Sequence, residues 1–233
     1  MERLLALMLV LSLVTVSCGK SGGGSSNEDA SVATATGNTD SGTDTGDDSG
    51  TDSTPTVPDT TSTLPALALS FKTNVSYLAG FDSTDTTKYN KAVALVKKVV
   101  ATEAFRTRVL NFTYSGSKTF VQNNGLSNAQ IYQSILDAAE SLKPVKNNTM
   151  DVGVKLYYEN STVVGYTNAS ITYINVNTKF FDSYAINEVA GNLFHEWLHK
   201  LGYGHDSSAT ARRPYSVPYG IGYIVRDIGK SFI

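Results

Sequence analysis

Cysteine is nearly absent from this chain of 233 residues, since Cys18 near the amino terminus is the only one. The rest of the chain therefore has no disulfide to stabilise it and no thiolate to occupy a metal site. Histidine is equally scarce, with three residues, and none of the three methionines lies beyond Met150. After the first seventeen residues, no segment is apolar enough to anchor the chain in a membrane.

Large apolar side chains are almost missing from residues 19–64, which are rich in Gly, Ser, Thr and Asp. Such a segment cannot bury enough surface to offset its chain entropy, so we expect residues 18–64 to be a disordered tether. The tether has eight acidic residues and one basic residue, whereas the chain from Pro65 onward has 17 basic and 12 acidic residues. That mild excess forms no basic motif, and we expect no nucleic-acid partner.

Residues 1–17 combine Arg3 with an apolar stretch that is too short for a lasting transmembrane helix, which is typical of a secretory signal peptide. The stretch ends at Cys18, and the sequence there resembles the cleavage site of bacterial lipoproteins. The resemblance implies that a lipid on Cys18 anchors the chain at the cell envelope, facing the periplasm or the surface. The absence of aspartate after Cys18 favours the outer membrane. The alternative is a plain signal peptide with an incidental cysteine.

Residues 65–233 are enough for one domain with a sizeable core. Their pattern predicts an α+β fold, in which a mixed sheet packs with helices. Helices are expected over residues 84–100, 101–110, 127–142 and 219–231, the last with Pro218 at its start. Strands are expected over residues 111–122, 152–158, 162–166 and 171–176. Turn signals at residues 159–161 and 167–169 favour a meander.

Between the last strand and the final helix, apolar residues recur with helical period from Ile186 to Leu201. Asp182 or Ser183 is the expected N-cap of this helix. The angular spacing predicts that His195 and His199 project away from the apolar stripe, so that one face of the helix packs on the core and the other lines a cleft.

All three histidines lie within His195–Asp206, which reads H-E-x-x-H-x-x-G-x-x-H-D. Two histidines four residues apart on a helix can direct one nitrogen each to a common zinc ion. Gly202 can end the helix in a left-handed conformation, and His205 then supplies a third ligand from a loop. Three protein ligands leave a fourth position open, as in catalytic zinc sites. Glu196 is offset from the ligands and suited to act as a general base.

This motif resembles that of the metzincin clan of zinc metalloendopeptidases. The resemblance implies a zincin domain with a short carboxy-terminal subdomain, zinc ligands at His195, His199 and His205, and a catalytic glutamate at Glu196. Asp206 resembles the residue at that position in adamalysins. The chain departs from the clan because it has no methionine downstream of the third histidine. Metzincins place that methionine in a tight turn beneath the metal.

The segment expected to form that turn is Tyr215–Gly220, with Pro218 close to the methionine position. Some metzincins have a tyrosine just after the methionine that approaches the metal. Tyr219 is therefore a candidate transition-state stabiliser, and the alternative is an ordinary packing tyrosine in a chain with 13 of them.

Together these features predict a zinc-dependent endopeptidase that hydrolyses a protein or peptide substrate and contacts the membrane only through its lipid. One alternative is a catalytically silent zinc-binding surface or adhesion module, although metal binding alone does not require Glu196. A third possibility retains the chemistry and changes the substrate to a cell-wall peptide cross-link or another amide.

Overall fold

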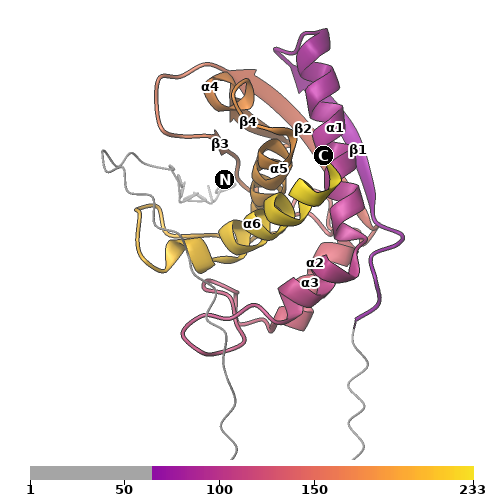
Figure 1. The fold of residues 1–233 in the computed structure, drawn as a ribbon, viewed down its shortest axis with the longest axis vertical. Helices are drawn as coiled ribbons and strands as arrows, with labels where there is room; N and C mark the ends of the chain where they lie inside the picture. The colour runs from indigo at the N-terminus through magenta and orange to yellow at the C-terminus, as the bar shows by residue number, and fades with distance from the viewer. Residues whose placement is uncertain (1–64) are drawn as a thin grey trace, which may run out of the picture. The chain divides into compact units, whose positions relative to one another are not determined.

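The computed structural model describes residues 65–233 (Figure 1). The predicted signal peptide, tether and lipidated Cys18 lie outside these residues. Within them the fold is mixed α/β, as the sequence predicts, with four strands, six α-helices and two short 3-10 helices. In chain order the elements are β1 (Lys72–Ala79), α1 (Ser83–Val100), α2 (Glu103–Leu110), α3 (Asn128–Asp137), β2 (Thr149–Tyr157), β3 (Gly165–Tyr166), β4 (Tyr173–Asn177), α4 (Thr178–Phe181), α5 (Ile186–Lys200), η1 (Arg213–Tyr215), α6 (Val217–Gly229) and η2 (Lys230–Phe232).

The sheet has the strand order β1-β2-β4-β3, in which β1 and β4 both run parallel to β2 and only β3 is antiparallel to its neighbour. The predicted meander is therefore wrong. Helices α1, α2 and α3 connect β1 to β2, and a crossover of this length is what a parallel pair requires. Strand β1 escaped prediction because it is a largely exposed edge strand whose sequence, KTNVSYLA, lacks regular alternation.

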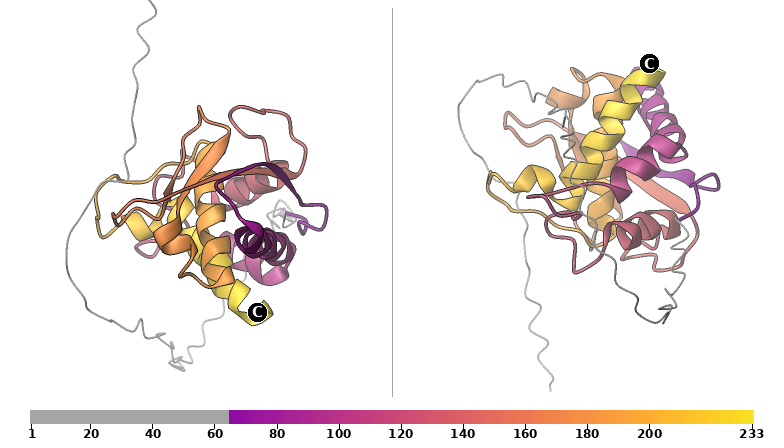
Figure 2. Two further views of the ribbon diagram at one scale, coloured as in Figure 1. Left: turned by 90° about the horizontal axis from the view of Figure 1, so that it is seen from above. Right: turned by 60° about the horizontal axis from the view of Figure 1, so that its bottom comes forward.

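Helix α5 lies in the interior of the fold, where it contacts α1 and α6 and the strands β3 and β4 (Figures 1 and 2). Its apolar side chains, among them Leu193, Phe194, Trp197 and Leu198, are almost fully buried in one core with α1, β2 and α6. The close approach of α6 requires glycine on both helices. A Cβ on Gly191 would lie 2.8 Å from the carbonyl oxygen of Gly222, and one on Gly222 would lie 3.0 Å from that of Gly191.

Residues 111–122 form a loop, so the strand predicted there is wrong. The chain turns back at Ser115 and Gly116, which both have positive φ, and Tyr114 and Ser117 exchange two backbone hydrogen bonds. The returning segment stacks Phe120 on Phe112 at 4.0 Å between ring centroids. Both rings pack against Gly220, where a Cβ would lie 2.9 Å from Phe112 and 3.0 Å from Phe120. The aromatic residues that suggested a strand instead support the first turn of α6.

The helix predicted over 127–142 ends at Asp137, because Ala138 adopts a left-handed conformation and turns the chain toward β2. Neither Asp182 nor Ser183 caps α5. The N-cap is Ala185, whose backbone N–H donates to the Glu188 carboxylate at 2.8 Å, while residues 178–181 form the separate short helix α4. The final helix begins two residues earlier than predicted, with Pro218 in its first turn. No helix in residues 65–233 has the length and apolar character that crossing a bilayer needs.

Candidate metal centre

Two of the three histidines lie on α5, and His195 faces α6, where a Cβ on Gly222 would lie 3.1 Å from the Cβ of His195. His195 is buried and His199 partly buried, and their ring centroids lie 5.1 Å apart. This spacing is the one expected for residues four apart on a helix. The predicted cleft is present at His195, which lines a pocket together with residues of α6 and of the loop before it.

The third histidine arrives from the loop that follows α5. Gly202 has φ +91°, the left-handed conformation expected of a glycine that ends a helix and reverses the chain. His205 is buried, and its ring centroid lies 5.2 Å from that of His195 and 4.9 Å from that of His199. The next side chain, Asp206, accepts hydrogen bonds from Gln122 at 2.8 Å and Thr210 at 2.6 Å, which fix the loop that carries His205.

The ring nitrogens that face one another can hold a common ion. One ligand atom from each histidine lies within 4.8 Å of the other two. His199 donates from Nδ1 to the carbonyl of Tyr203 at 2.7 Å, and His205 donates from Nδ1 to the carbonyl of Asp206 at 2.9 Å. Because a carbonyl oxygen can only accept, these bonds leave each Nε2 with a free lone pair, the arrangement that orients metal-ligating histidines.

His205 Nε2 carries the strongest sign of a missing partner. It is buried and makes no hydrogen bond within the described part of the chain. A buried polar atom left without a partner costs about 1–3 kcal/mol, so such atoms are uncommon unless they bind something. The donor set therefore fits a metal ion held by His195, His199 and His205. The three histidines that the sequence singled out do converge.

The histidines are held in the neutral form that a metal requires. Burial lowers the pKa of His199 to about 4, assisted by the neighbouring His205. Burial also lowers the pKa of His195 well below its usual value, assisted by His199, His205 and Arg213. The pKa of His205 is lowered mainly by burial as well. Neutral imidazoles are the ligating form, so the site is ready to bind a cation at neutral pH.

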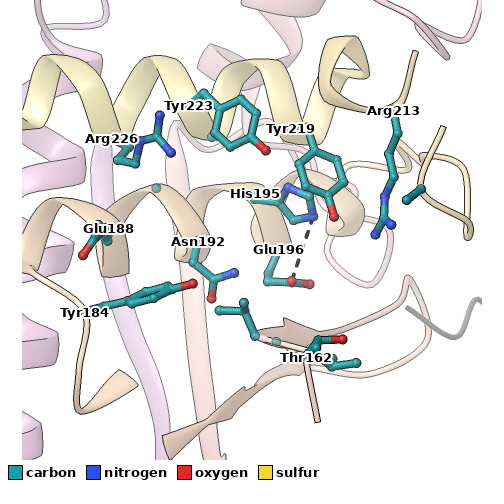
Figure 3. A pocket seen from close by; sticks show the side chains of 16 residues that line it. Thr162, Tyr184, Glu188, Asn192, His195, Glu196, Arg213, Tyr219, Tyr223 and Arg226 are labelled. Carbon is teal, nitrogen blue, oxygen red and sulfur yellow. Dashed lines mark ion pairs between the residues drawn. The ribbon is translucent and has the colours of Figure 1, made fainter. Parts of the chain in front are cut away.

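Glu196 lies beside the histidines and faces a pocket of about 410 Å³ (Figure 3). Its Oε1 is 4.0 Å from Nε2 of His195, and burial raises the pKa of the carboxyl to about 8, opposed by the charge of Lys200. The pocket runs along α5 from Glu196 past Asn192 toward Tyr184, which precedes the helix, with residues of α6 on one side and Thr162 on the other. A carboxyl so placed can exchange a proton with a molecule bound in the pocket.

Tyr219 comes from the first turn of α6, because residues 217–220 are helical. The tight turn predicted over Tyr215–Gly220 is therefore wrong. The Tyr219 ring lies 4.4 Å from that of His195 and 4.8 Å from that of His205, measured between centroids. Tyr219 points into the pocket (Figure 3). The carbonyl of Pro218 hydrogen-bonds His195, so this residue supports the site through its backbone.

Two further residues of the site escaped prediction. Arg213, in η1, lines the pocket and places its guanidinium carbon 4.9 Å from the centroid of the Tyr219 ring. Gln122, at the end of the loop formed by residues 111–122, donates a hydrogen bond to Asp206, although the two residues are 84 positions apart in sequence. Neither Arg213 nor Gln122 belongs to a motif with a fixed spacing, and nothing in the sequence indicates a role for Gln122. The only hint of Arg213 is the pair Arg212-Arg213, seven and eight residues past His205.

No family model matches this chain, and comparisons with curated proteins and with solved structures find no match either. Any functional assignment therefore depends on the chemistry of the site.

Proposed function

We propose that the protein is a zinc-dependent endopeptidase of metzincin type. One observation supports this above all others: three neutral histidines each place one ring nitrogen within 4.8 Å of the others, beside a buried carboxyl that faces a pocket. A metal-binding module has no need of the carboxyl or the pocket. Zinc is the metal we infer, because three imidazoles with an open fourth position form a common catalytic zinc set.

When bound, zinc would polarise a carbonyl and acidify water. The chain's own residues supply the remaining functions. Glu196 takes a proton from the attacking water and later returns it to the leaving nitrogen, a role that needs a carboxyl within reach of the reacting group. The pocket, which residues of α5, α6 and the segment 162–165 line, binds the side chain next to the scissile bond.

Tyr219 is positioned by α6 to assist. Its ring contacts two of the three proposed ligands, and its hydroxyl enters the same pocket as Glu196. In this proposal the hydroxyl donates a hydrogen bond to the oxygen of the reacting carbonyl. The lack of a methionine beneath the site is compensated by Pro218, whose carbonyl contacts His195 directly.

The test is turnover of a quenched peptide library by the purified protein, with and without a chelator, beside Glu196→Gln at equal zinc content. We expect cleavage that the chelator abolishes and zinc restores. A zinc-loaded protein that cleaves no peptide would favour the silent surface module. Cleavage of cell-wall cross-links alone would change the substrate class and retain the chemistry.

We also propose that the protein acts at a bacterial cell envelope, attached by a lipid on Cys18. The support is the apolar segment that ends at this cysteine. Cys18→Ala should move the protein from the membrane fraction to the soluble fraction. Unchanged partitioning into detergent would place the anchor elsewhere.

A further inference from the structure

Arg213 brings a positive charge to a site that would already hold a divalent cation. It lines the same pocket as His195, Glu196 and Tyr219. Its guanidinium carbon lies 4.9 Å from the centroid of the Tyr219 ring, and that ring lies 4.4 Å from the ring of His195 and 4.8 Å from that of His205, so the charge lies close to two of the three proposed ligands. Like charges at short range repel, so the guanidinium opposes metal binding when nothing else is bound. Its position becomes favourable once negative charge develops in the pocket.

Hydrogen bonds on both sides of the residue hold the backbone of Arg213 in place. Its backbone N–H donates to the carbonyl and the hydroxyl of Thr210, and its carbonyl accepts from the backbone N–H and the hydroxyl of Ser216. Its guanidinium lies over the Tyr219 ring, which is itself fixed by α6. In Figure 3 Arg213 and Tyr219 descend side by side into the pocket. A charged donor that is held in place before substrate arrives needs little reorganisation during the reaction.

We propose, on the basis of the endopeptidase function above, that Arg213 is a catalytic residue that stabilises the oxygen of the reacting carbonyl. In the step concerned, a water oxygen bonds to the carbonyl carbon, the π electron pair moves onto the carbonyl oxygen, and Glu196 takes one proton of the water. The pair then re-forms the C=O bond, the C–N bond breaks, and Glu196 gives its proton to the leaving nitrogen. Arg213 and Tyr219 both donate to the oxygen while it is negative.

Three variants of the full-length protein test this role, namely Arg213→Ala, Arg213→Lys and the control Arg212→Ala. Arg212 is the adjacent arginine with an exposed side chain, 3.7 Å from Asp206, so its loss removes the same charge from the same loop. Turnover of a cleaved peptide is the first readout. Arg213→Ala should lower kcat by roughly 10²–10³ while KM changes little, the loss typical of one oxyanion donor. Arg213→Lys should recover part of the loss, and Arg212→Ala should stay within threefold of the parent.

Two further readouts do not depend on peptide cleavage. Inorganic phosphate should bind the zinc-loaded parent, and Arg213→Ala should weaken this binding at least tenfold while Arg212→Ala does not. Zinc affinity, measured by competition with a chelator, should be equal or higher in Arg213→Ala, because a repelling charge has been removed. Phosphate that fails to bind the parent, or binds Arg213→Ala within threefold of it, overturns the proposal. Weaker zinc binding by Arg213→Ala would also overturn it, because that result indicates a structural role. If the parent cleaves no peptide, the proposed endopeptidase function fails. The phosphate and zinc affinities then still decide whether Arg213 contributes to binding an anion in the pocket.

Discussion

Two clusters of buried polar groups flank α5, and they differ in how their atoms are satisfied. In the first, near the carboxyl end of the helix, Glu140 accepts from the indole Nε1 of Trp197 at 2.6 Å and from the backbone N–H of Asp151 at 2.9 Å. Lys200 donates to the carbonyl of Ile171 at 2.6 Å, and Asp151 pairs with Lys143 at 2.8 Å. This cluster joins α5 to the sheet, and each of its four charged side chains has a partner in the protein.

The second cluster consists of the three histidines and Glu196. Here backbone carbonyls accept from Nδ1 of His199 and of His205, and Nε2 of His205 has no hydrogen-bond partner within residues 65–233. Burial raises the pKa of both glutamates, yet only Glu196 faces the pocket beside the histidines. The comparison indicates that the Glu140 cluster stabilises the fold and that the histidine cluster is built to bind and react.

Exchanging each glutamate for glutamine tests this distinction with the largest expected effect. Glu196→Gln should keep its zinc and lose roughly 10²–10⁴ in turnover, because general acid–base catalysis contributes about that much. Glu140→Gln is the matched control and should cleave peptide within about threefold of the parent, far short of that range. Equal losses in the two variants would erase the distinction.

Tyr219→Phe should reduce turnover at least tenfold, toward the roughly 10²–10³ that one oxyanion donor contributes. Zinc content should not change, because the ring that packs on His195 and His205 is retained. The measurement is kcat at saturating peptide with metal analysis of the same sample. Kinetics indistinguishable from those of the parent would make Tyr219 a packing residue.

Trp197→Phe tests the structural cluster alone. It removes the indole donor from buried Glu140 and reduces packing against Phe71 and Phe194. We expect the free energy of unfolding to fall by about 2–4 kcal/mol, the sum of a lost hydrogen bond to a charged group and a small cavity. Denaturant unfolding measures this, and kcat of the folded variant should be unchanged. A variant of full stability and low kcat would contradict the assignment.

The pH dependence of the metal-free protein gives the smallest effect, because two contributions oppose each other. The histidines have folded-state pKa values below their usual 6.5, so the unfolded chain binds more protons and stability falls as the pH drops from about 6.5 toward 4. Glu196 has a folded-state pKa raised from 4.5 to about 8, so it reduces stability increasingly as the pH rises between these values.

Glu196→Gln isolates the second contribution. Thermal unfolding of the metal-free variant and parent should show a stability advantage for the variant that grows from pH 5 to pH 8. An advantage that is the same at both pH values would mean that Glu196 titrates normally.

The sequence predicts the histidine cluster well and the rest of the site poorly, for a physical reason. His195, His199 and Gly202 act through local helix geometry, so spacing alone determines where they lie. Gln122 and Arg213 reach the site through tertiary packing. Gln122 depends on a loop that closes through stacking of Phe112 and Phe120, which composition alone cannot distinguish from a strand.

The same distinction applies to the fold. Helix α1 carries a capping box and a sustained apolar face, and its predicted and observed bounds agree within one residue. The order β1-β2-β4-β3 depends on long-range pairing, such as Val75 with Val152, that no local pattern encodes. Turn signals between strands indicate where the chain bends but not which strand it joins next, and the meander prediction failed on that point.

X-ray absorption at the zinc edge of the zinc-loaded protein tests the central claim most directly. One equivalent of zinc should be coordinated by three imidazole nitrogens at about 2.0–2.1 Å and one oxygen from solvent. His205→Ala should reduce the imidazole count to two. Less than half an equivalent of zinc in the folded parent, or a parent spectrum that His205→Ala leaves unchanged, would contradict a metal centre built from His195, His199 and His205.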